Sequence, residues 1–358
     1  MRRLVALLSL GLVLLAAPVA MGQSSGPNLY VCNQGEATIS VIDMASHSVV
    51  ETVDLTRMGF SENAKPHHVL ADPDGSYWYV TLIGDNTILK FNRDNELVDQ
   101  LSDFEVPGLM ALQGRSNRLL AGRSMSAVDP PQSIGILNRD SMTVEEEVDT
   151  FFPRPHSLVV GDDGTYGFVA SLATNQLMGV NLETGETELT RLGGEQQTLV
   201  QFAMTPDGHT LLAGGQRTGQ LLLFDARDAP ALTTTDTLEV GQQPWHPVIT
   251  SDGHTAYVPN KGSHSVSVVD LEARTVAATI EGDGLAQPHG TALSPDGQYL
   301  FVSNNNREGT YTPTGDNPDA GTITVIDTDT NEIVKVIEVG TYPSGIGTVG
   351  GQRARSME

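Results

Sequence analysis

The stretch spanning residues 288–340 reads PHGTALSPDGQYLFVSNNN…GTITVIDTDTNEIVKVIEVG, and it predicts a unit of four short strands. The expected strands cover residues 290–294, 299–303, 322–327 and 333–339. Pro295-Asp296-Gly297 is a turn sequence, with proline at its second position and a glycine for positive φ. The last two strands are rich in β-branched residues, which favour extended backbone.

Weaker copies of this unit recur along the chain. Aligned on the residue at the head of the first strand, the copies begin at Pro66, Pro107, Pro155, Leu199, Pro244, Pro288 and Pro343, with spacings of 41, 48, 44, 45, 44 and 55 residues. Repeats of about this length with four strands each are typical of β-propeller blades. The sequence therefore predicts an all-β fold.

The two ends of the repeat array complement each other. From Asn28 the chain opens with a second strand (NLYVCN), a third (ATISVID) and a fourth (VVETVDL), and no first strand precedes them. Residues 343–349 form a first strand with nothing after it. We expect this C-terminal strand to complete the N-terminal blade and to close a seven-bladed ring of four antiparallel strands per blade.

The repeat resembles the YVTN family of seven-bladed β-propellers, whose unit has the form P-x-G-V-x-x-S-P-D-G…Y-V-T-N…I-S-V-I-D. The matching strings are Tyr79-Val80-Thr81, Tyr30-Val31-Cys32-Asn33, Phe301-Val302-Ser303-Asn304 and Ser40-Val41-Ile42-Asp43. The resemblance covers nearly the whole chain after residue 22 and implies the fold. It does not imply one function, because related propellers include binding proteins, lactonases and redox enzymes.

The N-terminal segment predicts export. Residues 1–22 combine two arginines, an apolar run and small residues before Gln23, as a secretory signal peptide does. We therefore expect a signal peptide over 1–22, a propeller over 23–350, a disordered tail over 351–358, and a periplasmic or secreted protein. No membrane association is expected after the signal is removed.

The composition is strongly acidic, with a formal net charge of −24 and 20 basic residues. Such a surface repels phosphate backbones, so we expect no nucleic-acid partner. Screening at high salt would relieve the self-repulsion, and a halophilic source is the simplest explanation for the charge. The single cysteine, Cys32, excludes an intramolecular disulfide, and its place in NLYVCN predicts a buried strand residue.

Two links between second and third strands are unusually long. The first, residues 123–132, belongs to the most degenerate blade, which begins at Pro107; the second is residues 304–320. Proline and polar residues dominate both links, so neither extends a strand. In a propeller these links lie on the same face as the loops that lead into the first strands. They are predicted to form a rim on that face.

Histidines recur at the heads of the first strands. Five of the nine lie there, in four blades: His67 and His68 in PHHV, His156 in PHSL, His246 in PWHPV and His289 in PHGT. The heads face one another across the channel mouth, so the histidines should converge. His67, His156 and His289 are in register, and alternation along a strand predicts that these three point into the channel.

Converging imidazoles are ligands for transition metals, so the first hypothesis is a metal or haem site on His67, His156 and His289. The resemblance supports it, since similar propellers include the cytochrome-type nitrite reductases and nitrous oxide reductase. Their fuller patterns are missing here: the sequence has no C-x-x-C-H motif and no cupredoxin-like segment. A transition metal or haem remains the only cofactor hypothesis.

A second hypothesis is a lactonase-type hydrolase, as in propellers of the 6-phosphogluconolactonase type. His67 or His156 would activate water, and Arg123, Arg154 or Arg307 would orient an anionic substrate. The short turns that end each blade and the acidic surface count against this reading.

The third hypothesis, which we favour, is a monomeric, non-enzymatic binding or scaffold protein that holds a small molecule or a protein partner at the channel mouth. Its candidate ligand-binding residues are His67, His68, His156, Trp245, His246, His289, Arg123, Arg307 and Tyr311. Trp245 could offer a flat surface there, or could instead wedge between blades. Tyr311 lies in the longer of the two rim loops.

Overall fold

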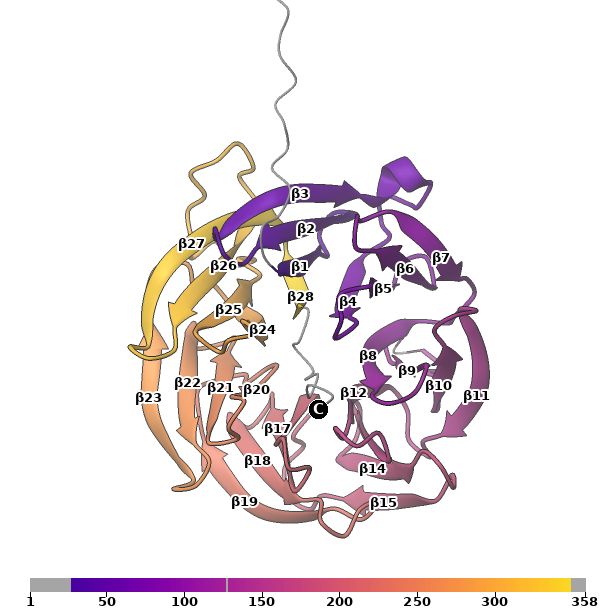
Figure 1. Cartoon of the computed structure of the whole chain (residues 1–358). Helices are drawn as coiled ribbons and strands as arrows, with labels where there is room; N and C mark the ends of the chain where they lie inside the picture. The colour runs from indigo at the N-terminus through magenta and orange to yellow at the C-terminus, as the bar shows by residue number, and fades with distance from the viewer. Residues whose placement is uncertain (1–26, 127, 349–358) are drawn as a thin grey trace, which may run out of the picture.

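Seven four-stranded antiparallel sheets stand around a common axis and close into a ring (Figure 1). The computed structural model describes residues 27–126 and 128–348. The predicted signal peptide and C-terminal tail lie outside the described residues. The structure thus confirms the all-β, seven-bladed propeller.

Each blade runs from an inner first strand to an outer fourth strand, and we number the blades from the N-terminus. Blade 1 consists of β28 (Pro343–Thr348), β1 (Asn28–Asn33), β2 (Thr38–Asp43) and β3 (Ser48–Asp54), and blade 2 consists of β4 (Pro66–Ala71), β5 (Tyr77–Leu82), β6 (Thr87–Asn92) and β7 (Leu97–Leu101). Blade 3 consists of β8 (Pro107–Gln113), β9 (Arg118–Arg123), β10 (Ser133–Asn138) and β11 (Thr143–Asp149), and blade 4 consists of β12 (Pro155–Val160), β13 (Tyr166–Ser171), β14 (Gln176–Asn181) and β15 (Thr187–Arg191). Blade 5 consists of β16 (Leu199–Met204), β17 (Thr210–Gly215), β18 (Gln220–Asp225) and β19 (Thr233–Glu239). Blade 6 consists of β20 (Val248–Ile249), β21 (Thr255–Asn260), β22 (Ser265–Asp270) and β23 (Thr275–Glu281). Blade 7 consists of β24 (Pro288–Leu293), β25 (Tyr299–Asn304), β26 (Ala320–Asp327) and β27 (Glu332–Thr341). A short 3-10 helix, η1 (Leu55–Met58), follows β3.

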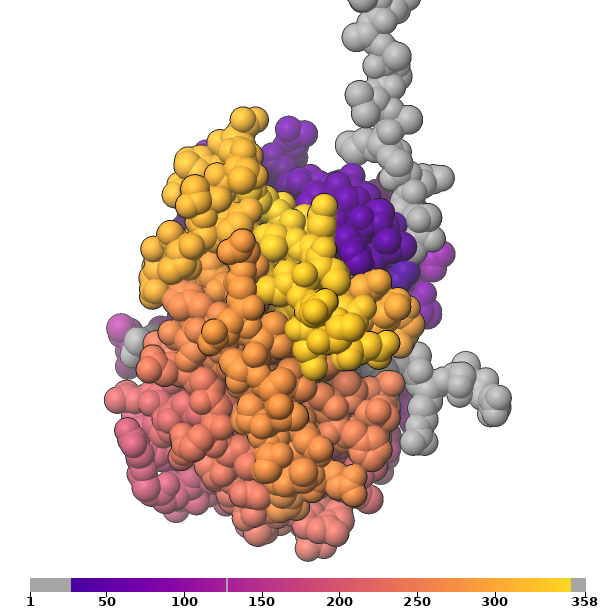
Figure 2. Space-filling view, turned by 90° about the vertical axis from the view of Figure 1, so that its left-hand side faces the viewer, coloured from indigo at the N-terminus to yellow at the C-terminus, as the bar shows by residue number. Residues whose placement is uncertain are grey.

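The ring closes as predicted, through strand β28. β28 pairs antiparallel with β1, with Tyr30 opposite Gly347 and Val31 opposite Ile346. It also packs against β4 and β24, the first strands of the two neighbouring blades. The C-terminal part of the ring lies directly against the N-terminal part (Figure 2). The two ends of the described chain therefore share one sheet.

The repeated motif residues have repeated structural roles. Asn33 at the end of β1 donates from Nδ2 to hydroxyls on β2, and Asn260 and Asn304 make the equivalent bonds to hydroxyls in blades 6 and 7. Buried amides need such partners, so the asparagine and the hydroxyl residues of the next strand occur together. The glycine of the predicted turn has positive φ in all five blades that carry it, as at Gly75 (69°) and Gly297 (75°).

Blade 6 departs from the predicted pattern. A first strand was expected from Pro244, but β20 contains only Val248 and Ile249, and Pro244 forms an isolated bridge to Asn260. Pro247 lies between Pro244 and β20, and because proline has no N–H it cannot donate a hydrogen bond to the neighbouring strand β21 at this point.

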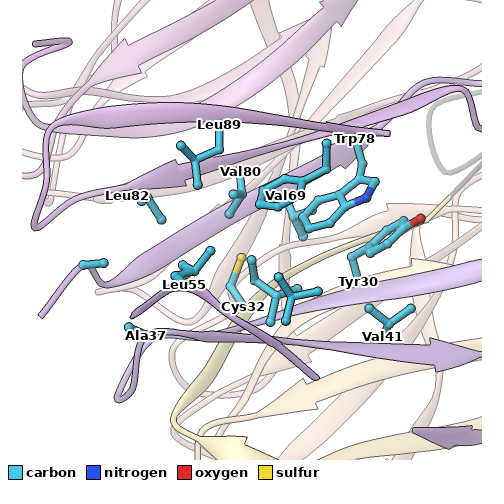
Figure 3. Close-up of a cluster of buried hydrophobic side chains, with 14 of the residues drawn as sticks. Tyr30, Cys32, Ala37, Val41, Leu55, Val69, Trp78, Val80, Leu82 and Leu89 are labelled. Atoms are coloured by element: carbon cyan, nitrogen blue, oxygen red, sulfur yellow. The ribbon is translucent and has the colours of Figure 1, made fainter. Parts of the chain in front are cut away.

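The core lies between neighbouring sheets, as the junction of blades 1 and 2 illustrates (Figure 3). Trp78 is 1% exposed and stacks between Tyr30 and Phe91, with centroid distances of 4.5 and 4.0 Å. Cys32 is fully buried in the same cluster, and burial raises the pKa of its thiol. The cysteine is therefore a core residue, as predicted, rather than a reactive thiol.

No helix within residues 27–126 and 128–348 has both the length and the apolar character to span a membrane.

Candidate functional site

One face of the ring, which we call the loop face, carries both the segments that lead into the first strands and the links between second and third strands. On this face the residue immediately before each of the seven repeat heads has positive φ, between 44° and 61°. These seven lead-in residues are Lys65, Val106, Arg154, Thr198, Gln243, Gln287 and Tyr342. These residues were not predicted as a set, although their signal in the sequence is simple: each of them directly precedes the head of a repeat.

The lead-in conformation is unfavourable by itself. A left-handed backbone costs a non-glycine residue about 1–2 kcal/mol, and a following proline disfavours it further. It is held by hydrogen bonds, because the carbonyl of each lead-in residue accepts an N–H from the link between second and third strands, as Lys65 O does from Ile83 N (3.2 Å) and Tyr342 O from Gln34 N (3.0 Å). Strained backbone of this kind is concentrated at functional sites.

His67 on β4 and His156 on β12 meet directly, with their Nε2 atoms 3.5 Å apart. His156 Nδ1 lies 2.9 Å from the carbonyl of Val200 and must donate to it. In the neutral ring, His156 Nε2 is then an acceptor, so His67 Nε2 carries the proton. His67 Nδ1 is left as a buried acceptor with no partner in the described part of the chain.

A second pair, His246 and His289, lies alongside, with ring centroids 4.9 Å apart. Trp245 packs on His289 at 5.0 Å. His246 Nε2 and His289 Nδ1 are also buried without hydrogen-bond partners within residues 27–126 and 128–348. The fifth histidine, His68, accepts a hydrogen bond from the N–H of Met110 at Nδ1 (3.2 Å), so its Nε2 carries the proton.

Alternation along the strands predicted that only His67, His156 and His289 point into the channel, but the heads of these strands are irregular. The pairing of β4 with β5 shifts register between Pro66 and His68, and β12 and β24 carry similar shifts at their heads. A bulge interrupts the alternation of side chains. His68 therefore joins the cluster with His67, and together with His246 it lines a central channel cavity of about 180 Å³.

Burial keeps the whole cluster neutral. It lowers the pKa of His67 to about 4 and, with the charge of neighbouring His67, lowers that of His68 to about 3. The pKa values of His156, His246 and His289 are likewise well below the usual range, first because of burial and then because of the other histidines. A ring with so low a pKa is a weak general base at neutral pH, which disfavours the lactonase role considered for His67.

The three-histidine metal set is not assembled. Only His67 and His156 of the three lie within hydrogen-bonding distance of each other, and the described residues contain no group of three or more His, Cys, Asp or Glu arranged to hold a metal ion. In a neutral imidazole the nitrogen that carries the proton can donate a hydrogen bond, and the other nitrogen can accept one.

Beside the histidines, the loop face has a cavity of about 700 Å³ at the junction of blades 7, 1 and 2. The lead-in residues Lys65 and Tyr342 line it, together with Arg307, Tyr311 and Asp319 from the β25–β26 link. This link is therefore part of the rim, as predicted. The remaining wall is polar and includes Gln34, Glu62, Asn63, Asn305 and Asn306.

Two of the predicted ligand-binding side chains are already engaged. The Tyr311 hydroxyl donates to Glu338 on β27 (2.9 Å), which also accepts N–H bonds from Thr314 and Gly315 and so fixes the β25–β26 link to its blade. Arg123 pairs with Glu147 on β11 and lies over the Phe104 ring, with its Cζ 4.3 Å from the centroid. The Arg123 charge is thus compensated within blade 3.

Lys261, which was not predicted, joins the residues at the mouth. Its Nζ lies over the rings of Trp245 (4.6 Å) and Tyr342 (5.7 Å), and the Arg307 guanidinium lies 4.9 Å from the same Tyr342 centroid. These contacts connect the half-buried Trp245 and the histidine cluster to the 700 Å³ cavity. The β21–β22 link that carries Lys261 has no unusual length or motif in the sequence to mark it.

The ring and its histidine-lined channel define the molecule as a seven-bladed β-propeller. No protein-family model matches the sequence, and no curated protein sequence matches it either; membership of the YVTN family therefore stays a prediction.

Solved structures resemble it in fold. A functionally unknown protein from Desulfotomaculum acetoxidans DSM 771 superposes with a TM-score of 0.71 at 13% identity, covering 90% of this chain and 99% of that one. Hydrazine synthase from Kuenenia stuttgartiensis superposes with a TM-score of 0.66 at 16% identity, covering 81% and 91%. At these identities the likeness concerns the fold alone.

Proposed function

We propose that this propeller is a non-enzymatic binding protein that holds a small molecule at the loop-face mouth of its channel. The observation that carries the proposal is the set of three buried imidazole nitrogens without partners: His67 Nδ1, His246 Nε2 and His289 Nδ1. A buried polar atom that is left unpaired costs about 1–3 kcal/mol. A ligand or its bridging water that supplies hydrogen bonds there would recover part of that cost.

The neighbouring cavity supports the same proposal. Its volume of about 700 Å³ is within the range of small-molecule sites, and its lining mixes aromatic, amide and charged side chains. Two of its lining residues, Lys65 and Tyr342, are held in the strained lead-in conformation. Rigid placement of this kind lowers the conformational cost of binding.

The sequence also supports proposals on localisation, oligomeric state and partners. We propose export to the periplasm or beyond, on the composition of residues 1–22, and a monomeric protein with no nucleic-acid partner, on the net charge of −24. A protein partner docking on the loop face is the main competing occupant.

Tryptophan fluorescence tests the proposal, because Trp245 and Trp78 are the only tryptophans. In a Trp78→Phe variant, Trp245 alone reports on the mouth. We expect members of a small-molecule library balanced in charge to shift its emission saturably. Asn63→Phe, which places an aromatic ring at the lining of the cavity, should weaken that response at least tenfold.

Gln298→Phe is the matched control, since Gln298 is exposed in a turn between a first and a second strand, on the face opposite the loop face. It should leave the response unchanged. The proposal fails when no compound produces a saturable shift, or when Asn63→Phe and Gln298→Phe behave alike.

A further inference from the structure

Two cations, Lys261 and Arg307, lie close together at the channel mouth of an otherwise acidic protein. Lys261 is one of only four lysines, and it lies within reach of the exposed Arg307. Within residues 27–126 and 128–348, neither side chain takes part in an ion pair, whereas Arg118, Arg123, Arg139 and Arg227 are each paired with a carboxylate. The two cations thus lack the carboxylate partner that six other basic side chains of residues 27–126 and 128–348 have.

Both cations are held in place by aromatic rings. Lys261 lies between Trp245 and Tyr342, and Arg307 lies against Tyr342. Contact with the negative face of an aromatic ring stabilises a cation, but it leaves the N–H donors free for an anion. Two like charges gathered on one ring repel each other, and an anion between them would remove that repulsion.

We propose that Lys261 and Arg307 form a binding site for the carboxylate of a small organic acid, with Trp245 and Tyr342 as its walls. The inference rests on the proposed function and specifies its ligand class. The guanidinium of Arg307 can bind a carboxylate through two parallel N–H bonds, and Lys261 supplies a point charge.

The charge of the whole molecule selects a monoanion over a polyanion. With a net charge of −24, the protein repels any approaching anion, and the repulsion grows with the charge of the ligand. The carboxylates Glu62 and Asp319 line the cavity, and Glu308 follows Arg307 in the sequence, so the mouth is not uniformly positive. A single carboxylate is best matched to two cations in such surroundings.

The opposite face of the ring offers a cavity of similar size, about 720 Å³, lined by Arg115, His209 and Arg227. There, however, Arg227 is paired with Asp225, and His209 lies 3.2 Å from Asp207. Two of its three basic side chains therefore already have acidic partners. This contrast favours the loop face for an anion.

Isothermal titration calorimetry with sodium benzoate tests the inference. We expect saturable binding that weakens with added NaCl, and at least a tenfold loss of affinity in Lys261→Met and in Arg307→Gln, because each removes a charge-assisted interaction. Lys335→Met makes the same change in net charge on the exposed face of β27 and should leave the affinity within twofold of the wild type. Sodium sulfate should bind this site more weakly than sodium benzoate does.

The pH dependence provides a second readout. Burial, followed by the charge of Arg307, lowers the pKa of Lys261 to about 8, while Glu308 opposes the shift. Benzoate stays ionised above pH 7 and the nearby His246 and His289 stay neutral, so affinity should fall as Lys261 loses its proton between pH 7 and 9. Lys261→Arg, which keeps its charge, should retain binding at pH 9.

The inference is overturned by three results: no benzoate binding, equal losses in Lys261→Met and Lys335→Met, or an affinity that is the same at pH 7 and 9. These results differ from failure of the proposed function. Neutral or cationic compounds that shift Trp245 emission while benzoate does not bind would support a binding site at the mouth and reject the carboxylate assignment.

Discussion

A chain truncated after Tyr342, which lacks β28, is expected to lose cooperative folding altogether. The deletion leaves β1 as an unpaired inner edge and removes Ile346 from the core shared with blade 7. It also removes the packing of β28 against β4 and β24, so both neighbouring blades lose contacts. Because net stabilities are about 5–15 kcal/mol, losing one of the 28 strands that the described residues form, at the point of ring closure, is enough to unfold the protein.

Circular dichroism and urea unfolding measure this directly. A circular permutant that joins Thr348 to Asn28 by a short linker and opens the chain at the exposed turn at residues 183–185 should unfold cooperatively, because it restores the same sheet. The ring-closure account is contradicted when the truncated chain retains the wild-type unfolding midpoint.

A point substitution tests the same contact more gently. A Cβ at Gly345 would lie 2.3 Å from the carbonyl oxygen of His67 and 2.8 Å from the Cα of His68, so Gly345→Val must push β28 away from β4. We expect a loss of about 3 kcal/mol in the free energy of unfolding. Gly193→Val, where nothing lies within 4 Å of the added Cβ, should change it by less than about 0.5 kcal/mol.

Acidification from pH 7 to pH 5 is expected to destabilise the folded protein strongly. The five histidines have ordinary pKa values of about 6.5 when unfolded and lower values when folded, so below pH 6.5 the unfolded chain binds protons that the folded chain does not. Their contribution is present above pH 6.5 and is lost as the pH falls. Between pH 7 and pH 5, each histidine that stays neutral in the folded state lowers the free energy of unfolding by about 2 kcal/mol, which is on the order of 9 kcal/mol for all five.

The pH window separates the histidines from the carboxylates. The pKa values of Asp225 and Glu338 are lowered to about 2, chiefly by hydrogen bonds from Arg227 and Thr314, respectively, so the stability they contribute is lost at more acidic pH, below their unfolded pKa values near 4. Between pH 6 and 5 the slope of unfolding free energy against pH therefore reports mainly on the histidines.

The matched variants compare slopes, so a general loss of stability does not obscure the result. His67→Gln combined with His156→Gln should reduce the slope between pH 6 and 5 by about two protons, roughly 2.7 kcal/mol per pH unit. His254→Gln changes an exposed histidine and should leave the slope as it is. A wild-type protein equally stable at pH 5 and 7 would show that the cluster is not buried and neutral.

The fold could be predicted from the sequence because the repeat encodes it redundantly. Six of the seven aligned heads, from Pro66 to Pro343, start the first strands. The incomplete blade at the N-terminal end and the single strand at the C-terminal end complement each other, which predicts the closure through β28. The convergence of the histidines followed from the same alignment, since equivalent positions of different blades face one axis. The spacing of the repeat can be recognised along the chain even where the sequence of a single copy has diverged.

The details of the site could not be predicted, because they depend on contacts between blades and on irregular backbone. The bulge that brings His68 to the same cluster as His67 breaks the alternation from which side-chain direction is predicted. The ion pair of Arg123 with Glu147 and the hydrogen bond from Tyr311 to Glu338 depend on which side chains of the outer strands lie nearby. Lys261 gains its role only from the rings that surround it.

The most direct test of the binding site is the anomalous difference density of bromine in crystals soaked with 4-bromobenzoate. The account predicts a peak at the loop-face mouth beside Trp245 and Tyr342, with the carboxylate between Lys261 and Arg307. Bromine bound only in the opposite cavity near Arg115 and Arg227, or a mouth left without bromine at saturating ligand, would contradict it.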